Sequence, residues 1–356
     1  MINRDVKKSE RILYFDLLNI AACFAVICIH HNGLAHTYAA NRVWKECLLA
    51  EVGCFWAVPV FLMLSGANLM NYRKKYSTKV FLKKRMVKVL FPWISWSIIN
   101  LIVKIYIHQY DVTALSKRNI INDILSCKIE GVYWFFPMII SVYLMMPILS
   151  LIVEEKFRNV LWYLVWTSLI FNATIPLFLS LVGINWNSSL GIPMSGYVIF
   201  AIIGYLLSTQ TLKKNTRIIV YMLGVLSCIV RYLGIYILST HDGQKNYTFF
   251  NYTHIYSYGL AIAVFVFFQY FPWHKFMGKF ETWLSVDLEI IIKKLSGYSF
   301  GIYLIHKLVM QAELSILHFA ESDLIWRTGA CFLTYVVCLL VVILMKRIPL
   351  LKKIVP

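Results

Sequence analysis

Charged residues are scarce in this chain: Asp, Glu, Lys and Arg make up 15% of its 356 residues, whereas hydrophobic residues make up 60%. A soluble domain averages about a quarter charged residues. Long polar stretches are also missing, because apolar segments of about 18 to 23 residues follow one another, the length of a helix that crosses about 30 Å of hydrocarbon. The sequence therefore predicts an all-α, polytopic transmembrane helical bundle that forms a single domain over residues 1–356.

Cysteine patterns of the kind that bind metals are missing as well. The eight cysteines include no CxxC pair and no Cys/His ligand spacing. Most lie inside apolar segments, where a free thiol usually acts as a small packing residue. We therefore expect no metal site and no disulfide framework.

Acidic residues are outnumbered by basic ones, 17 to 35, which gives a net charge of +18. The distribution of this charge argues against nucleic acid as a partner, since 25 of the 35 Lys and Arg residues fall in alternate connections. That asymmetry follows the positive-inside rule and predicts ten spans with both termini cytoplasmic, surrounded by membrane lipids. We place the spans near residues 13–33, 50–70, 90–110, 132–152, 160–182, 191–209, 217–239, 253–271, 297–317 and 324–345.

One cytoplasmic connection, residues 272–299, has a helical pattern of its own. Its apolar residues recur at intervals of three and four, with charged residues between them. This pattern predicts an amphipathic helix that lies on the inner membrane surface.

The first span contains polar residues that a purely structural anchor would not need. Asp16, Asn19 and His30 fall within a narrow sector at 100° per residue, so they form one polar stripe. Such a stripe is expected to face the bundle interior or a watery cavity. A structural alternative is that His30 and His31 merely end the helix at the outer interface, with Gly33 as its C-cap.

The ninth span repeats this behaviour. Ser299, His306 and Glu313 are spaced seven residues apart, so they share a helical face. Glu313 is expected at a depth similar to that of His30, where a carboxylate beside an imidazole would fix its tautomer. A structural hydrogen bond is the alternative role for Glu313.

Further signals lie near the inner leaflet. Pro59 permits a kink in the second span, and Ser65-Gly66 allows a backbone or a ligand to approach closely. Lys83, Lys84, Arg85 and Lys88 precede the third span, where they serve either as topological charges or as contacts for the phosphates of a cytosolic donor.

Two other features are harder to interpret from sequence. Tyr133 and Trp134 open the fourth span and fit an interfacial aromatic belt. Arg231 lies inside the seventh span and requires a partner that the sequence does not identify.

These pieces, in this order, resemble the acyltransferase 3 family of polytopic membrane O-acyltransferases. The resemblance covers nearly the whole chain and rests on several short matches. They are Arg11, Phe15-Asp16-Leu17-Leu18 and His30; Val58-Pro59-Val60-Phe61 and Leu64-Ser65-Gly66; Lys84-Arg85 and Pro92-Trp93; Tyr133-Trp134-Phe135-Phe136, Tyr143 and Pro147; and Ser299-Phe300-Gly301-Ile302-Tyr303-Leu304-Ile305-His306.

The resemblance implies transfer of an acyl group, usually acetyl, from cytosolic acyl-CoA to a hydroxyl of a surface or lipid-linked carbohydrate, in a bacterial cell membrane. No bound cofactor is implied, since acetyl-CoA is a substrate. The family's first helix carries an Arg and, after ten residues, a His. The His corresponds to His30, but the Arg position is Asn19, which has no charge. Arg11, Lys84 and Arg85 are candidate replacements.

Roles follow for the matched residues. Catalysis is assigned to His30, either as the base that deprotonates the acceptor or as a transient acyl carrier. Asp16 and Glu313 are candidate orienting carboxylates, and His306 joins the catalytic set. Donor binding is assigned to Asn19, Ser65, Lys84, Arg85 and Trp134.

Two other functions fit the same polar residues. A transporter or flippase would also bury ionisable groups along its path, although the sequence shows no paired half-repeats. The Asn19 departure also fits a membrane subunit that has lost catalysis. The acceptor glycan, the acyl group and the oligomeric state are not determined by the sequence.

Overall fold

A computed structural model describes residues 12–190, 196–284 and 286–356. Arg11, the first residues of the predicted span 191–209 and residue 285 lie outside these ranges. The described chain is helical, and its α-helices are as follows. They are α1 (Leu13–His31), α2 (Arg42–Cys54), α3 (Ala57–Leu69), α4 (Thr78–Tyr106), α5 (Lys117–Leu125), α6 (Phe135–Leu149), α7 (Arg158–Ser168), α8 (Ile175–Leu181), α9 (Tyr197–Thr209), α10 (Lys214–Asp242), α11 (Ile255–Tyr270), α12 (Trp273–Leu284), α13 (Leu288–Ser296), α14 (Ser299–Leu317), α15 (Leu324–Arg327) and α16 (Gly329–Arg347).

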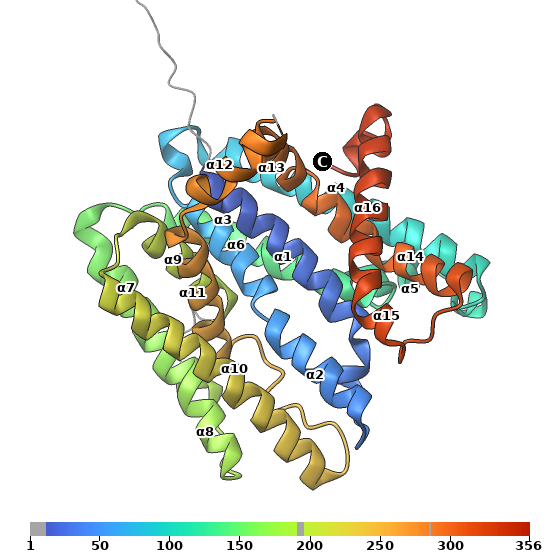
Figure 1. Ribbon diagram of the computed structural model, residues 1–356, viewed down its shortest axis with the longest axis horizontal. Coiled ribbons are helices and arrows are strands. Elements are labelled where there is room, and N and C mark those ends of the chain that lie inside the picture. The colour runs from blue at the N-terminus through green and yellow to red at the C-terminus, as the bar shows by residue number, and fades with distance from the viewer. Residues whose placement is uncertain (1–11, 191–195, 285) are drawn as a thin grey trace, which may run out of the picture.

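The helices confirm a polytopic membrane bundle. Within the described ranges, eight helical segments are long and apolar enough to cross a membrane. Two shorter apolar helices, α9 and α11, correspond to the remaining predicted spans. Helix α1 runs through the middle of the bundle (Figure 1) and packs against α3, α11, α13, α14 and α16. The polar residues of α1 are therefore surrounded by protein.

We call the end of the bundle that carries α12, α13 and the C-terminal residues the basic end (Figure 1). The other end, which carries α2 and the end of α10, is called the opposite end. The connection 272–299 is helical, as predicted, but it forms two helices rather than one. Asp287 starts the second by accepting a hydrogen bond from the Ile290 amide at 3.1 Å.

Two of the predicted spans differ from the helices that contain them. The second span is a broken helix, because α2 ends at Cys54 and α3 begins at Ala57. Pro59 lies in the first turn of α3, where its missing N–H removes no helical hydrogen bond. Helix α4 begins at Thr78 rather than near residue 90, so its cationic residues lie on the helix itself and not in a preceding loop.

Helices α3 and α9 make an unusually close crossing. A Cβ on Gly66 would lie 1.8 Å from the carbonyl oxygen of Ala201, and one on Gly204 would lie 2.0 Å from that of Met63. Only hydrogen fits at both positions, so the two backbones are in contact. The predicted close approach at Ser65-Gly66 is therefore made by α9, and it fixes the height of Ser65 in the bundle.

Arg231 has a partner that the sequence did not reveal. Its guanidinium forms a bidentate ion pair with the Glu51 carboxylate, at 2.6 and 2.8 Å, and donates to the Phe249 carbonyl at 3.1 Å. Both side chains of the pair are almost fully buried, and the Phe55 ring lies 3.5 Å from the guanidinium carbon. A buried pair of this kind is stabilising only as a pair, because removing one partner leaves an uncompensated charge.

Candidate active site

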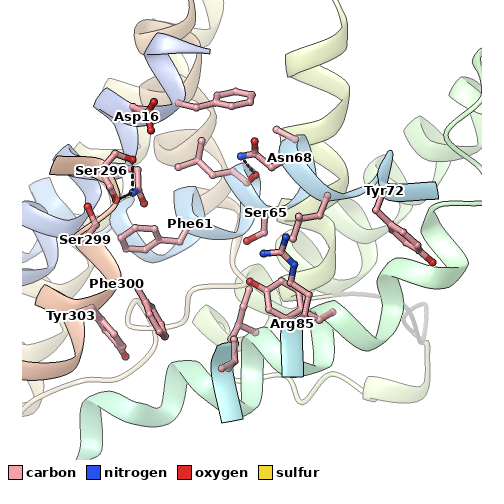
Figure 2. A pocket seen from close by; sticks show the side chains of 18 of the residues that line it. Asp16, Phe61, Ser65, Asn68, Tyr72, Arg85, Ser296, Ser299, Phe300 and Tyr303 are labelled. Carbon is pink, nitrogen blue, oxygen red and sulfur yellow. Dashed lines mark hydrogen bonds between the residues drawn. The ribbon is translucent and has the colours of Figure 1, made fainter. Parts of the chain in front are cut away.

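A large cavity opens at the basic end and extends along α1 into the bundle. Its volume is about 830 Å³. The lining residues along α1 run from its N-cap, Ile12, to Val26, which corresponds to a depth of about 21 Å at 1.5 Å per residue. Segments α3, α4, α6, α13 and α14 complete the wall, with part of it shown in Figure 2.

The mouth and the floor of the cavity differ in chemistry. Asn71, Lys75 and Arg85 contribute polar and cationic groups on the side of the basic end. Apolar and aromatic residues line the deep part, namely Val26, Val58, Phe61, Phe135 and Tyr303. The cavity therefore suits a ligand with an anionic head and a long, weakly polar arm.

Four of the nine predicted site residues line this cavity: Asp16, Asn19, Ser65 and Arg85. Asn19, where the resemblance predicts an Arg, donates through Nδ2 to the carbonyl and hydroxyl oxygens of Ser296, both at 3.0 Å. The amide thus ties α1 to the end of α13. It cannot supply the positive charge that an Arg would bring.

Arg85 supplies a positive charge inside the same cavity. Figure 2 shows its guanidinium close to Ser65, across the cavity from Ser296 and Ser299. Among the residues that the structure describes, none accepts a hydrogen bond from the buried Nε of Arg85. The neighbouring Lys84 is exposed, lies outside the lining, and places its Nζ 4.6 Å from the centre of the Tyr76 ring. The two adjacent cations therefore have different environments.

The deep end of the cavity stops one helical turn from a pair of imidazoles. Val26 precedes His30 by four residues on α1, and Tyr303 precedes His306 by three on α14. The ring centres of His30 and His306 are 5.1 Å apart, with 33° between the ring planes. The predicted inward orientation of His30 is thus what the structure shows, although His30 itself does not line the cavity.

The tautomer of His306 follows from its hydrogen bonds. Nδ1 lies 2.6 Å from the Tyr303 carbonyl, which only accepts, so Nδ1 carries the proton. In the described part of the chain, Nε2 of this fully buried ring has no hydrogen-bond partner. A neutral His306 therefore keeps a free acceptor in the small space that it shares with His30.

Two carboxylates are not where a role beside His30 would require them. Asp16 precedes His30 by fourteen residues, about 21 Å along the helix axis, so it cannot orient that ring. Glu313 is hydrogen-bonded through Oε2 to the Thr334 hydroxyl, which also lies 2.8 Å from Nε2 of His31. The carboxylate is thus connected to the neighbouring histidine. Asn32 rather than Gly33 is the C-cap of α1, and its backbone N–H donates to the Cys28 and Ile29 carbonyls, both at 3.1 Å.

The fourth span also differs from its prediction. Tyr133 is buried, not part of an interfacial belt, and its hydroxyl donates to the Leu304 carbonyl and accepts from Asn100, both at 2.9 Å. Trp134 does not line the cavity; it stacks on Tyr252 with ring centres 5.5 Å apart. A direct contact of Trp134 with a ligand in this cavity is therefore not supported.

Sequence reasoning missed several residues of the deep wall. Phe61 and Tyr143 were noted only as parts of motifs, and Tyr303 was given no role, yet all three line the cavity. Helical spacing offered a signal for two of them. Phe61 is one turn from Ser65, and Tyr303 is one turn from both Ser299 and His306.

Comparison with known protein families identifies the family of this chain. The family model described as "Acyltransferase domain" (Acyl_transf_3) matches residues 12–343. No curated protein and no solved structure matches the chain. Because the family match spans nearly all of the described bundle, including the cavity and both histidines, the protein belongs to the acyltransferase 3 family and is a multi-pass membrane acyltransferase.

Proposed function

We propose that this membrane acyltransferase takes an acyl group, in the simplest case acetyl, from cytosolic acyl-CoA. The acceptor is a hydroxyl of a surface or lipid-linked carbohydrate, and the basic end faces the cytoplasm of a bacterial cell. The observation that carries the proposal is the cavity, which begins among cationic side chains and ends one turn from His30 and His306.

Donor binding uses the difference between the mouth and the floor of this cavity. Phosphates of CoA bind near Arg85 and Lys75, because cationic side chains form charge-assisted hydrogen bonds with phosphate oxygens. The pantetheine arm lies along the walls toward Phe61 and Tyr303. This orientation brings the thioester to the deep end of the cavity, one helical turn from the histidine pair.

His30 acts at the point where the donor meets the acceptor. A carbohydrate hydroxyl becomes a good nucleophile when a base removes its proton. His30 removes that proton, or accepts the acyl group itself before passing it on. His306, held in one tautomer by the Tyr303 carbonyl, offers its free Nε2 to the His30 ring or to a water between them.

The test compares His30→Ala with the parent protein, purified and shown to have the same thermal midpoint. Loss of a general base is expected to lower acyl transfer about 10²- to 10⁴-fold. Affinity for acyl-CoA, measured by calorimetry, is expected to stay within about twofold of the parent, because the cavity ends before His30. Undiminished transfer by His30→Ala would contradict the proposal.

A second assay separates the enzyme from a transporter. Inside-out vesicles receive acetyl-CoA that is radiolabelled in the acetyl group, and the glycan fraction is recovered. Label in the glycan with the parent and none with His30→Ala supports acyl transfer. Substrate movement without label would support a flippase instead. Mass spectrometry of surface polysaccharides with and without the gene then identifies the acetylated sugar.

A further inference from the structure

Beyond the cavity, a second chain of buried polar groups joins α1, α14 and α16 near the opposite end. His31 is 1% exposed, Thr334 is fully buried and Glu313 is 7% exposed. Nδ1 of His31 lies 2.9 Å from the Trp326 carbonyl, and Nε2 lies 2.8 Å from the Thr334 hydroxyl. That hydroxyl is also hydrogen-bonded to Oε2 of Glu313.

The donors and acceptors of this chain permit few proton arrangements. The Trp326 carbonyl only accepts, so Nδ1 of His31 must carry a proton. The Thr334 hydroxyl has one hydrogen, so it donates to one neighbour and must accept from the other. Both of its hydrogen bonds therefore form only if at least one further proton resides on Nε2 of His31 or Oε2 of Glu313, and a proton on both would leave the buried group with a net charge.

We infer that His31, Thr334 and Glu313 form a proton relay that holds one shared proton. In the first state, protonated Glu313 donates to Thr334, which donates to the neutral His31 ring. In the second state, Nε2–H of the His31 imidazolium donates to Thr334, which donates to the Glu313 carboxylate. Passage between the states breaks one O–H bond at Glu313, exchanges the hydrogen of Thr334 and forms one N–H bond at His31. The summed charge of the three groups is zero in both states.

The surroundings suit a relay without net charge. Within the described ranges, the buried Oε1 of Glu313 has no hydrogen-bond partner, which is costly for an isolated carboxylate but less so for a neutral acid. Two cations stand near: Lys307 interacts with His31, and Arg327 is already paired with Glu46 at 2.8 Å. His30, the residue before His31 on α1, also interacts electrostatically with His31.

The position next to His30 gives the relay a consequence, which rests on the proposed function. When His30 takes a proton from the acceptor, two adjacent imidazolium rings would repel each other in a medium of low dielectric. The relay then shifts to its first state, in which His31 is neutral. The relay itself exists in the resting protein and requires no substrate.

The test measures the two proton positions separately in the full-length protein without substrate. The infrared difference between the parent and Glu313→Gln gives the fraction of Glu313 that is a neutral acid. Nitrogen-15 NMR of labelled histidine, compared with His31→Gln, gives the fraction of His31 that is imidazolium. The two fractions are expected to add up to one from about pH 6 to pH 8, the range in which histidines ordinarily titrate.

Thr334 variants provide matched controls. Thr334→Ser keeps the hydroxyl and is expected to keep the constant sum. Thr334→Val has nearly the same shape but no hydroxyl, so the two groups titrate independently and their sum varies with pH. Ionised Glu313 together with neutral His31 in the parent, or the same pH dependence of the sum in the parent and Thr334→Val, would overturn the relay.

A further variant covers the case in which Thr334→Val does not fold. Glu313→Gln removes the acid that balances the imidazolium, so His31 is expected to be neutral throughout this pH range. An imidazolium that persists in Glu313→Gln would overturn the relay. Because these readouts need no acyl transfer, they are independent of the proposed reaction.

Discussion

At the residue scale, Asn19 stands where the resemblance to the family predicts an Arg. Asn19 makes two hydrogen bonds to Ser296 and thereby closes one side of the cavity. Arg85 lines the other side and points toward Ser65 (Figure 2). The positive charge of this cavity therefore comes from Arg85 on α4 and from Lys75 just before α4, and not from position 19 on α1.

The two adjacent cations of α4 allow this interpretation to be tested. Arg85→Met is expected to raise KM for acyl-CoA about 10- to 100-fold, because a hydrogen bond to a charged group contributes about 1.5–3 kcal/mol. Lys84→Met removes the same charge from the next position, outside the cavity lining, and is expected to change KM less than about twofold, the effect of an exposed charge. Initial rates at varied acetyl-CoA concentrations give both values.

Arg85→Lys serves as the conservative control for the charge. It is expected to recover part of the lost affinity, since Lys binds phosphate as a point charge but lacks the planar fork of Arg. Equal KM values for Arg85→Met and Lys84→Met would show that the cavity does not hold the donor phosphates.

At the scale of the element, the crossing of α3 and α9 determines where the polar residues of α3 lie. Gly66 and Gly204 allow each backbone to contact the other, which no larger residue would permit. Helix association inside a membrane depends on this kind of close packing, because lipid offers no hydrophobic driving force between helices. The crossing thus holds Ser65 against the cavity.

Gly66→Ala is expected to separate α3 from α9. The added methyl would meet the Ala201 backbone, which cannot rotate away as a side chain would. Overpacking of this kind costs about 1–3 kcal/mol or more. The thermal midpoint in detergent is therefore expected to fall by several degrees, and KM for acyl-CoA to rise as Ser65 shifts.

Gly53→Ala provides the matched control for this prediction. Gly53 lies on α2, and an added Cβ there meets no atom within 4 Å. Alanine favours a helix over glycine by about 1 kcal/mol, so this variant is expected to melt at the parent temperature or slightly above it. Gly66→Ala melting like Gly53→Ala would show that the α3–α9 crossing contributes little.

At the scale of the whole molecule, the cavity opens at the same end of the bundle at which the basic residues gather. The cavity opens at the basic end, and the histidine pair lies beyond its floor. If the basic end is cytoplasmic, as the positive-inside rule predicts, the donor enters from the cytosol. The direction of the chemistry then follows from the topology.

Labelling with a membrane-impermeant maleimide is expected to reveal this topology. Tyr247 lies beyond the end of α10 and is 70% exposed, whereas Leu350 lies at the basic end and is 74% exposed. Tyr247→Cys is expected to react in intact cells, and Leu350→Cys only after the cells are permeabilised. The parent controls for background, since its eight thiols are buried or half-buried. The reverse pattern would place the basic end outside.

The sequence predicted much of this molecule from simple physical rules. Apolar length predicted ten spans, and within the described ranges eight helical segments are long and apolar enough to cross a membrane. Helical periodicity predicted that His30 and His306 face the interior, because the bilayer excludes polar groups. The family resemblance, now confirmed by the match over residues 12–343, gave the reaction class. The predicted span bounds differ from the helix bounds at α3 and α4. The second predicted span is interrupted between Cys54 and Ala57, and α4 begins at Thr78, ahead of its cationic residues.

Partners across the bundle were decided only by the tertiary structure. The sequence predicted that Glu313 lies at a depth similar to that of His30. In the structure, the rotation of the helices connects Glu313 through Thr334 to His31 instead. It left Arg231 without a partner, and the fold supplied Glu51 from α2. Membrane spans and inward-facing positions follow from each residue's own preference for lipid or protein, so the sequence alone determines them. Contacts between helices depend on their relative rotation and height, which side-chain packing across the whole bundle fixes.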